Sequence, residues 1–303
     1  MLDYQAVKNW DFGDIVHSYT RRDTILYALG VGIGGNPLDA GELRFVYEKN
    51  LSAVPTMAAV LGTPGFWWRD PKTGADWVKL VHGEQHVRLF RPLPPEGTII
   101  ARNKVLSLTD KGPGKGAIAV IRREIFDQGG EEQIAESTQV TFLRGDGGFS
   151  EVCGVSDRGP EALPAAPERA PDIQVDLPIL EQAALIYRLS GDYNVLHVDP
   201  EVARAAGFHR PILHGLCTFG MAAHAVLREC CNYNAACLRR FSVRFTSPVF
   251  PGETLRFQLW KEGGGRVRLR ASVDARNVVV LNNGLIELEQ RVTVALFAHL
   301  FQV

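Results

Sequence analysis

The chain has 303 residues, of which 46% are hydrophobic and 22% charged, and these fractions are typical of a soluble globular protein rather than a coiled coil, a collagen or a disordered chain. With 33 basic and 34 acidic side chains there is no overall field to attract nucleic acid or an anionic membrane, so any anionic ligand must be held by a local site. No run of sequence approaches the roughly 20 apolar residues that a membrane-spanning helix needs.

The N-terminus and the cysteines favour a cytoplasmic protein. The first residues, MLDYQAVKNWDFGD, carry acids and aromatics where an export signal would have a basic start and an apolar run. The five cysteines are an odd number without a C-x-x-C pair, which argues against a disulfide framework and against a zinc site. The adjacent Cys230 and Cys231 could form a redox pair, although two small apolar core residues are the interpretation that we favour.

The first half begins with a predicted helix and continues into strands. The run RRDTILYAL (21–29) has helical periodicity, and the glycine-rich GVGIGG (30–35) that follows it lacks the preceding strand of a dinucleotide site. Further on, VRLFRPL (87–93) leads into a proline-glycine turn. The runs GAIAVIRREIFD (116–127) and QIAESTQVTFLR (133–144) alternate with a period of two, which indicates half-buried antiparallel strands.

Residues 158–178 are rich in proline and alanine and interrupt this alternation, so we interpret them as a linker. The linker divides the chain into an N-terminal half, 1–157, and a C-terminal half, 179–303. The second half repeats the order of the first, with a helical run LEQAALIYRL and then alternating runs that include RVRLRASVDA (266–275) and GLIELEQRVTVALF (284–297).

Matched motifs relate the two halves. Tyr27 and Tyr187 each lie near the end of the first helical run of their half, at a spacing of 160 residues. Val87 and Val243 each begin a strand before a proline-glycine turn, at a spacing of 156. Helices that precede a meander of strands in both halves predict an α+β architecture that arose by duplication.

A long helix is predicted over residues 214–229, HGLCTFGMAAHAVLRE, which is apolar on nearly all faces, as expected of a helix wrapped by a sheet. An antiparallel sheet curled around a long helix is the hotdog arrangement. We therefore predict a double hotdog, with two antiparallel sheets each curled around a long helix and a less regular helix in the first half. Two unrelated α+β domains are the alternative, and the ordered pairing of motifs makes it the weaker one.

Reactive side chains occur in the second half at places where the first half has none. Asp192, Asn194 and His197 lie within six residues in SGDYNVLHVDP, whereas the matching LGVGIGGNPLDAGE contains no histidine. The polar entry ILHG to the long helix corresponds to the apolar AVPT of the first half. Turn chemistry is an alternative role for Asp192 and Asn194. Asp199, before Pro200, is predicted to cap a helix and to have no catalytic role.

Two further histidines have structural interpretations. His214 is plausible as a side chain that forms a hydrogen bond near the helix start, and His224 is expected to be a packed core residue. A metal held by Asp192, His197 and another histidine is conceivable, but the spacing matches no zinc pattern, so we predict no metal site.

The stretch from Tyr187 to His197, YRLSGDYNVLH, resembles the type-2, (R)-specific enoyl-CoA hydratases. This MaoC-like group includes the hydratase unit of peroxisomal multifunctional β-oxidation enzymes. Its signature is approximately Y-x-L-S-G-D-x-N-P-[LIV]-H, and the one departure here is Val195 in place of proline. The resemblance continues through GFHRPILHGLCTFG and, in the first half, through YALGVG, VYEKN and LVHGEQHVRLFRPLPPEGT.

The resemblance implies a lyase of fatty-acid metabolism that hydrates trans-2-enoyl-CoA reversibly to (R)-3-hydroxyacyl-CoA. Asp192 and His197 would hold and activate one water, and Asn194 would orient that water or its loop. The backbone N–H of Gly215 would stabilise the thioester enolate. The first half would be non-catalytic and would make room for the acyl chain.

Substrate contacts are expected from five further residues. His214 and Leu216 flank Gly215 at the helix start, and Glu48 in VYEKN would serve the site or the interface between the halves. Arg240 and Arg244 could meet the phosphates of coenzyme A, although for either arginine alone a solvated basic strand is the slightly favoured interpretation. Beyond the acyl-CoA substrate we expect no cofactor, no nucleic acid and no membrane insertion, and we expect a homodimer.

Two other functions remain open at this point. A hotdog thioesterase would bind the same thioesters and direct water at the carbonyl carbon instead. A non-catalytic acyl-CoA-binding module is possible when a duplicated half loses its reactive loop. The Asp-x-Asn-x-x-His pattern together with His-Gly-Leu favours hydration over both.

Overall fold

The structure, a computed structural model, describes residues 1–289. The first half contains α1 (Tyr4–Lys8), β1 (Asp14–Tyr19), α2 (Arg21–Gly30), α3 (Ala40–Val46), β2 (Leu80–Leu89), β3 (Gly97–Asp110), β4 (Ala117–Phe126), β5 (Gln133–Leu143) and α4 (Ser150–Cys153). The second half contains β6 (Ile173–Pro178), α5 (Ala183–Tyr187), α6 (Pro200–Ala205), α7 (Gly215–Cys231), β7 (Leu238–Phe245), β8 (Thr254–Lys261), β9 (Arg266–Val273) and β10 (Val278–Leu288). The part of the predicted last strand beyond residue 289 lies outside the described residues.

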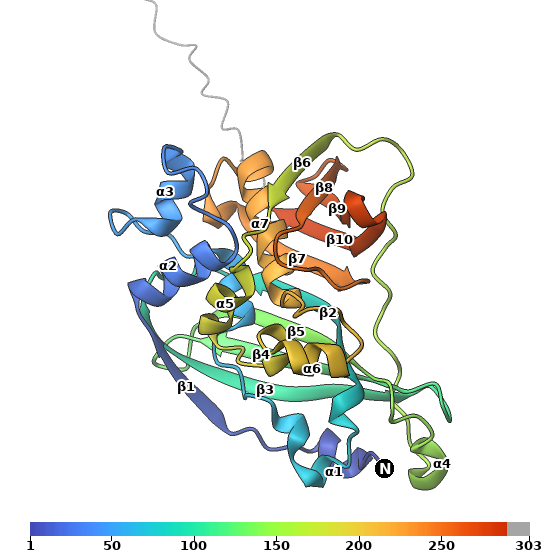
Figure 1. The fold of residues 1–303 in the computed structure, drawn as a ribbon. Coiled ribbons are helices and arrows are strands. Elements are labelled where there is room, and N and C mark those ends of the chain that lie inside the picture. Colours follow the sequence, from blue (N-terminus) through green and yellow to red (C-terminus); the bar gives the residue numbers. More distant parts are fainter. Residues whose placement is uncertain (290–303) are drawn as a thin grey trace, which may run out of the picture.

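The strands form one antiparallel sheet rather than the two sheets that we predicted. Its order is β1-β3-β4-β5-β2-β7-β10-β9-β8-β6, so each half contributes five strands and the two halves meet where β2 pairs with β7 (Figure 1). The reason for the difference is that β2 and β7 would otherwise be exposed edges, and pairing them satisfies the backbone N–H and C=O groups of both.

An approximate two-fold axis relates the halves. In the β2–β7 ladder His86 lies opposite Ser242, and 242 − 86 = 156 is the repeat spacing found between Val87 and Val243. A residue that faces its own counterpart must lie on the axis. One hydrophobic core with members from both halves surrounds this junction, and a smaller cluster lies within the first half.

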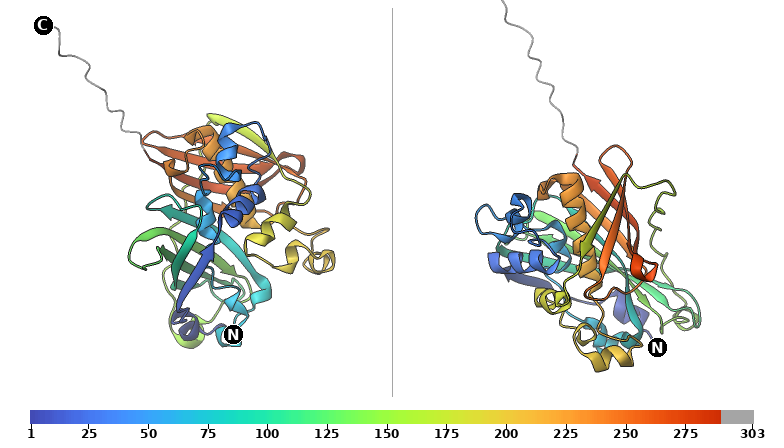
Figure 2. Two further views of the ribbon diagram at one scale, coloured as in Figure 1. Left: turned by 90° about the vertical axis from the view of Figure 1, so that its left-hand side faces the viewer. Right: turned by 45° about the horizontal axis from the view of Figure 1, so that its top comes forward.

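The predicted central helix is confirmed as α7, whose side chains are buried over most of its length. It contacts β6, β7 and β10, and Figure 2 shows it running along the strands of the second half. Gly220 allows Val31 of the first half to pack closely against α7, because a Cβ on residue 220 would collide with the Val31 side chain. At the matching place the first half has the short 3₁₀ turn Pro55–Ala59 instead of a long helix, which confirms that its helix is less regular, and this turn packs against α7.

The predicted linker is shorter than we expected. Its last six residues form β6, which pairs with β8, and the alternation of Ile173, Val175 and Leu177 toward the core explains why this segment is a strand. Proline at 178 ends that strand at its edge. The part of the predicted linker without helix or strand is therefore 158–172.

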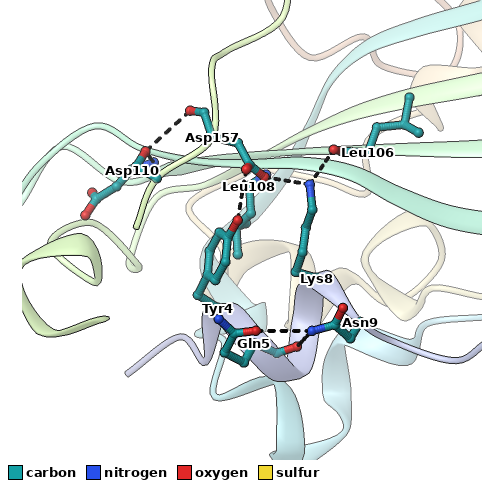
Figure 3. A network of polar contacts seen from close by, with 9 residues as sticks. Tyr4, Gln5, Lys8, Asn9, Leu106, Leu108, Asp110 and Asp157 are labelled. Carbon is teal, nitrogen blue, oxygen red and sulfur yellow. Dashed lines mark hydrogen bonds and ion pairs between the residues drawn. The ribbon is translucent and has the colours of Figure 1, made fainter. Parts of the chain in front are cut away.

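Hydrogen bonds connect Asp157, at the end of the first half, with α1 at its beginning (Figure 3). Asp157 accepts hydrogen bonds from the Tyr4 hydroxyl at 2.9 Å, from Lys8 Nζ at 2.7 Å and from the Leu108 backbone N–H at 2.8 Å. Although partial burial opposes the effect, these bonds lower the pKa of the Asp157 carboxyl. Among residues 1–289 no helix has both the length and the apolar character to cross a membrane.

Candidate active site

The reactive loop lies between α5 and α6. The helical run that begins with α5 continues through the 3₁₀ turn Arg188–Ser190 and ends at Gly191, whose φ of +112° is left-handed and favours glycine. Two side chains then shape the loop. Asp192 Oδ1 accepts the Asn194 N–H at 3.2 Å, and Asn194 Oδ1 caps the next 3₁₀ turn, Val195–His197, by accepting the Leu196 N–H at 3.2 Å. Asn194 thus holds the turn that carries His197.

His197 is oriented by a backbone carbonyl. Its ring is 9% exposed, and Nδ1 lies 2.9 Å from Ile212 O. Because a carbonyl oxygen can only accept, Nδ1 must carry the proton, and in the neutral ring Nε2 is then unprotonated. His197 therefore has a free lone pair on Nε2, as a general base requires.

His214, at the start of α7, contacts two residues of the same loop. Its ring stacks on that of His197 with the centroids 3.7 Å apart, and its Nε2 lies 3.1 Å from Asp192 O. The hydrogen-bonding role predicted for His214 near the helix start is confirmed. Asp199 is confirmed as the cap of α6, because its side chain accepts the N–H groups of Glu201 and Val202.

Burial keeps both histidines neutral. It lowers the pKa of His197 below its usual value, against the opposing effects of the Ile212 carbonyl and the Asp192 charge. Burial also lowers the pKa of His214 to about 4, and the neighbouring His197 acts in the same direction. At neutral pH the site thus contains two neutral imidazoles beside the Asp192 side chain.

One ligand atom from each of Asp192, His197 and His214 lies within 4.8 Å of the other two. The His197 ring and the Asp192 side chain are thus close enough to hold a water molecule between them. The same donor set, with one carboxylate and two imidazoles, could also bind a divalent cation. The sequence spacing did not predict this convergence of all three groups, because His214 comes from a different element.

Gly215 is the first residue of α7, where backbone N–H groups have no partner within the helix. The N-cap residue His214 makes no capping hydrogen bond with its side chain. Gly215 is exposed, so this N–H is open to an approaching ligand, and a Cβ there would be in ordinary contact with the Phe245 ring at 3.4 to 3.7 Å. The positive end of the helix dipole favours an oxyanion there.

Three of the predicted substrate-binding residues are not brought to this cluster. Phe245 faces α7, and because strand side chains alternate, Arg244 and Arg240 point to the opposite face, where both are exposed. Glu48 is exposed just after α3. Their contacts with a ligand stay predictions. Leu216, by contrast, directly follows Gly215 and packs partly buried against the core.

Other interpretations concern residues away from the cluster. His224 is confirmed as a core residue, 2% exposed, with its Nε2 3.6 Å from Glu42 Oε1. The five cysteines, all in the described part of the chain, are free, and Cys231 is buried. A cavity of about 330 Å³ lined by residues of both halves lies near Tyr233, beyond the opposite end of α7 from Gly215. At 1.5 Å per residue, α7 separates the two by roughly 25 Å.

Family models match both halves. A MaoC-like domain matches residues 162–283, and the N-terminal domain of the hydratase 2 unit of multifunctional enzyme type 2 matches residues 17–145. The chain is 40% identical to 3-hydroxyacyl-thioester dehydratase Y of Mycobacterium tuberculosis over 282 residues, which is 90% of this chain and 94% of that protein. It is 38% identical to the peroxisomal enoyl-CoA hydratase 2 of Arabidopsis thaliana, covering 88% and 89% of the two chains.

Solved structures of similar proteins support the same fold and family. A MaoC-like dehydratase from Phytophthora capsici superposes with a TM-score of 0.82 at 33% identity, over 96% of this chain and all of that one. A Mycobacterium tuberculosis protein described as a double hotdog matches with a TM-score of 0.55 at 17% identity, over 91% and 94% of the chains, which bears on the fold alone. The α+β double-hotdog prediction is confirmed, and with two long relatives near 40% identity the chain belongs to the MaoC-like double-hotdog hydratases.

Proposed function

We propose that this hydratase adds water reversibly to trans-2-enoyl-CoA to give (R)-3-hydroxyacyl-CoA. The observation that carries the proposal is the convergence of Asp192, His197 and His214, in which the Nε2 of a neutral His197 is free to accept a proton. Gly215, with its open N–H, directly follows His214 at the start of α7. The names of the relatives, an enoyl-CoA hydratase 2 and a 3-hydroxyacyl-thioester dehydratase, describe the two directions of such a reaction.

In the proposed mechanism Asp192 and His197 hold one water. His197 Nε2 accepts a proton from that water as its oxygen forms a bond to C3 of the enoyl group, and the C2–C3 π electrons move toward the thioester carbonyl. The Gly215 N–H donates to the resulting enolate oxygen. The pair then returns the proton to C2, so that the elements of one water are added and both side chains regain their starting state.

The two halves would divide the work. The second half, 179–303, would carry the hydration chemistry, and the first half, 1–157, would make room for the acyl chain beside its short 3₁₀ turn. Assembly as a homodimer stays a prediction. A cytoplasmic location also stays a prediction, because the relatives include both a peroxisomal and a bacterial protein.

The function is tested by incubating the purified protein with trans-2-enoyl-CoAs of several chain lengths. We expect loss of the conjugated enoyl absorbance, no release of free thiol, and an (R) product. Free thiol without loss of conjugation would assign a thioesterase. Binding without either change would assign the acyl-CoA-binding module. Activity lost on dialysis against EDTA and restored by Zn²⁺ would show that the three converging side chains hold a metal.

A further inference from the structure

A histidine of the first half lies beside the candidate site. His82 is on β2 just beyond the end of the β2–β7 ladder, whose last pair is Glu84 with Arg244. A register shift between His82 and Glu84 interrupts the pairing of β2 with β5 at the same place. Such a bulge re-aims the side chain at the end of a strand.

The contacts of His82 lead to Gly215. The His82 ring packs edge-on against Phe245, with the centroids 4.9 Å apart and an interplanar angle of 66°. The same Phe245 ring lies 3.4 to 3.7 Å from the position of a Cβ on Gly215. β2 also contacts α7 directly. His82 and the open N–H of α7 therefore share one aromatic neighbour.

His82 also lies within range of the Asp192 charge. Burial lowers the pKa of His82 to about 4, against the opposing effects of the Glu84 backbone and then of the Asp192 charge. His82 does not belong to the group formed by Asp192, His197 and His214. Its buried Nε2 finds no hydrogen-bond partner among the described residues. Because a buried polar atom without a partner is costly, such an atom commonly has a functional explanation.

We propose that His82 of the first half is a second hydrogen-bond donor to the thioester carbonyl, acting from Nε2 beside the Gly215 N–H. This inference rests on the proposed hydratase function. A carbonyl oxygen has two lone pairs and can accept from both donors, and a donor matters most as charge develops on that oxygen in the enolate. A neutral imidazole with its proton on Nε2 supplies this bond without adding a charge. The first half would then take part in the chemistry.

The test compares His82→Leu, His82→Gln and the matched His86→Leu, a substitution four residues along the same strand at a ring that contacts Glu84. We expect His82→Leu to lower kcat by about 100-fold, the typical effect of losing one oxyanion donor. His82→Gln keeps an N–H donor and should retain more activity than His82→Leu, and His86→Leu should resemble the wild type. Thermal unfolding of each variant identifies any that fail to fold.

A spectroscopic probe separates this role from a structural one. When the carbonyl oxygen of 4-(dimethylamino)cinnamoyl-CoA accepts hydrogen bonds, its absorption maximum moves to longer wavelength. We expect this shift on binding to be reduced in His82→Leu, partly restored in His82→Gln, and preserved in Asp192→Asn. A folded His82→Leu protein with wild-type kcat and the full shift would overturn the inference, as would equal losses in both His82 variants with an unchanged shift. Wild-type protein that hydrates no enoyl-CoA would instead refute the proposed function.

Discussion

The two halves share one strand order but differ at the start of the helix that their sheet should surround. At the 160-residue spacing of Tyr27 and Tyr187, Gly215 corresponds to Pro55 (215 − 55 = 160), and both are the first residue of their helical segment. Pro55 has no N–H to offer, whereas Gly215 does. The second half continues into 17 helical residues and the first half stops after five.

The loops before these helix starts also differ, because only the loop of the second half carries reactive side chains. At the 160-residue spacing Asp192 corresponds to Gly32 and His197 to Pro37, so the carboxylate and the imidazole have no counterparts. The strands are preserved in both halves because their alternation builds the shared core. The comparison teaches that this scaffold does not depend on its reactive groups, and that a half can lose them without losing its fold.

The largest effect should come from removing the groups that only the second half has. We expect Asp192→Asn and His197→Gln each to lower the hydration rate by about 1,000-fold, within the roughly 10² to 10⁴ that a general base and its partner contribute. The unfolding temperature of each variant should stay close to that of the wild type. A variant that hydrates enoyl-CoA at a near-normal rate would remove its residue from the mechanism.

A smaller effect is expected from giving the second half the helix start of the first. Gly215→Pro removes the N–H, and proline is well tolerated at the first helical position. His214, with φ −58° and ψ 134°, already has the extended conformation that a residue before proline requires. We expect kcat to fall by about 100-fold, or roughly 3 kcal/mol, with little change in unfolding temperature.

Gly215→Ala is the matched control for the proline variant, because it keeps the N–H and places a Cβ in ordinary contact with Phe245. Its rate should lie much closer to the wild type. If alanine and proline reduce the rate equally, access to the helix start matters and hydrogen-bond donation does not.

The sequence predicted those parts of the molecule that depend on local pattern. Period-two alternation identified β4, β5 and β9, and the continuous apolar run identified α7. Pairing between β2 and β7 could not be predicted, because edge strands reveal their partner only when the halves are placed together. The Ile212 carbonyl that orients His197 is a backbone atom with no sequence signature. The faces of Arg240 and Arg244 depend on strand register, which their basic character does not reveal.

The acid dependence should be dominated by the histidines of the second half. His197 must be neutral to accept a proton, and burial lowers its pKa, so kcat/KM should hold from pH 8 to below the ordinary histidine pKa of about 6.5 and fall only at lower pH. A pH-rate profile measures this. A decline that begins above pH 7 would be inconsistent with a buried neutral base.

The same burial makes folding acid-sensitive. The pKa of His214 and that of His224 are about 4 in the folded protein. The unfolded chain, with ordinary histidines, therefore binds more protons below about pH 6.5. The free energy of unfolding should fall progressively from about pH 6.5 to about pH 4, and thermal unfolding at several pH values measures it. His224→Gln should reduce this dependence, and an unchanged dependence would place its cause elsewhere.

The smallest effect should come from Asn194, whose counterpart in the first half is Gly34 (194 − 34 = 160). Because Asn194 Oδ1 caps the turn that carries His197, Asn194→Ala should cost about 1 kcal/mol in that turn and lower kcat/KM by about five-fold. Asn194→Ser keeps a capping oxygen and loses the amide N–H₂. If capping is the whole role of Asn194, the serine variant should approach the wild-type rate in steady-state kinetics. If the amide also orients the reacting water, serine should be as slow as alanine, and the loop of the second half would then differ from that of the first by three reacting groups instead of two.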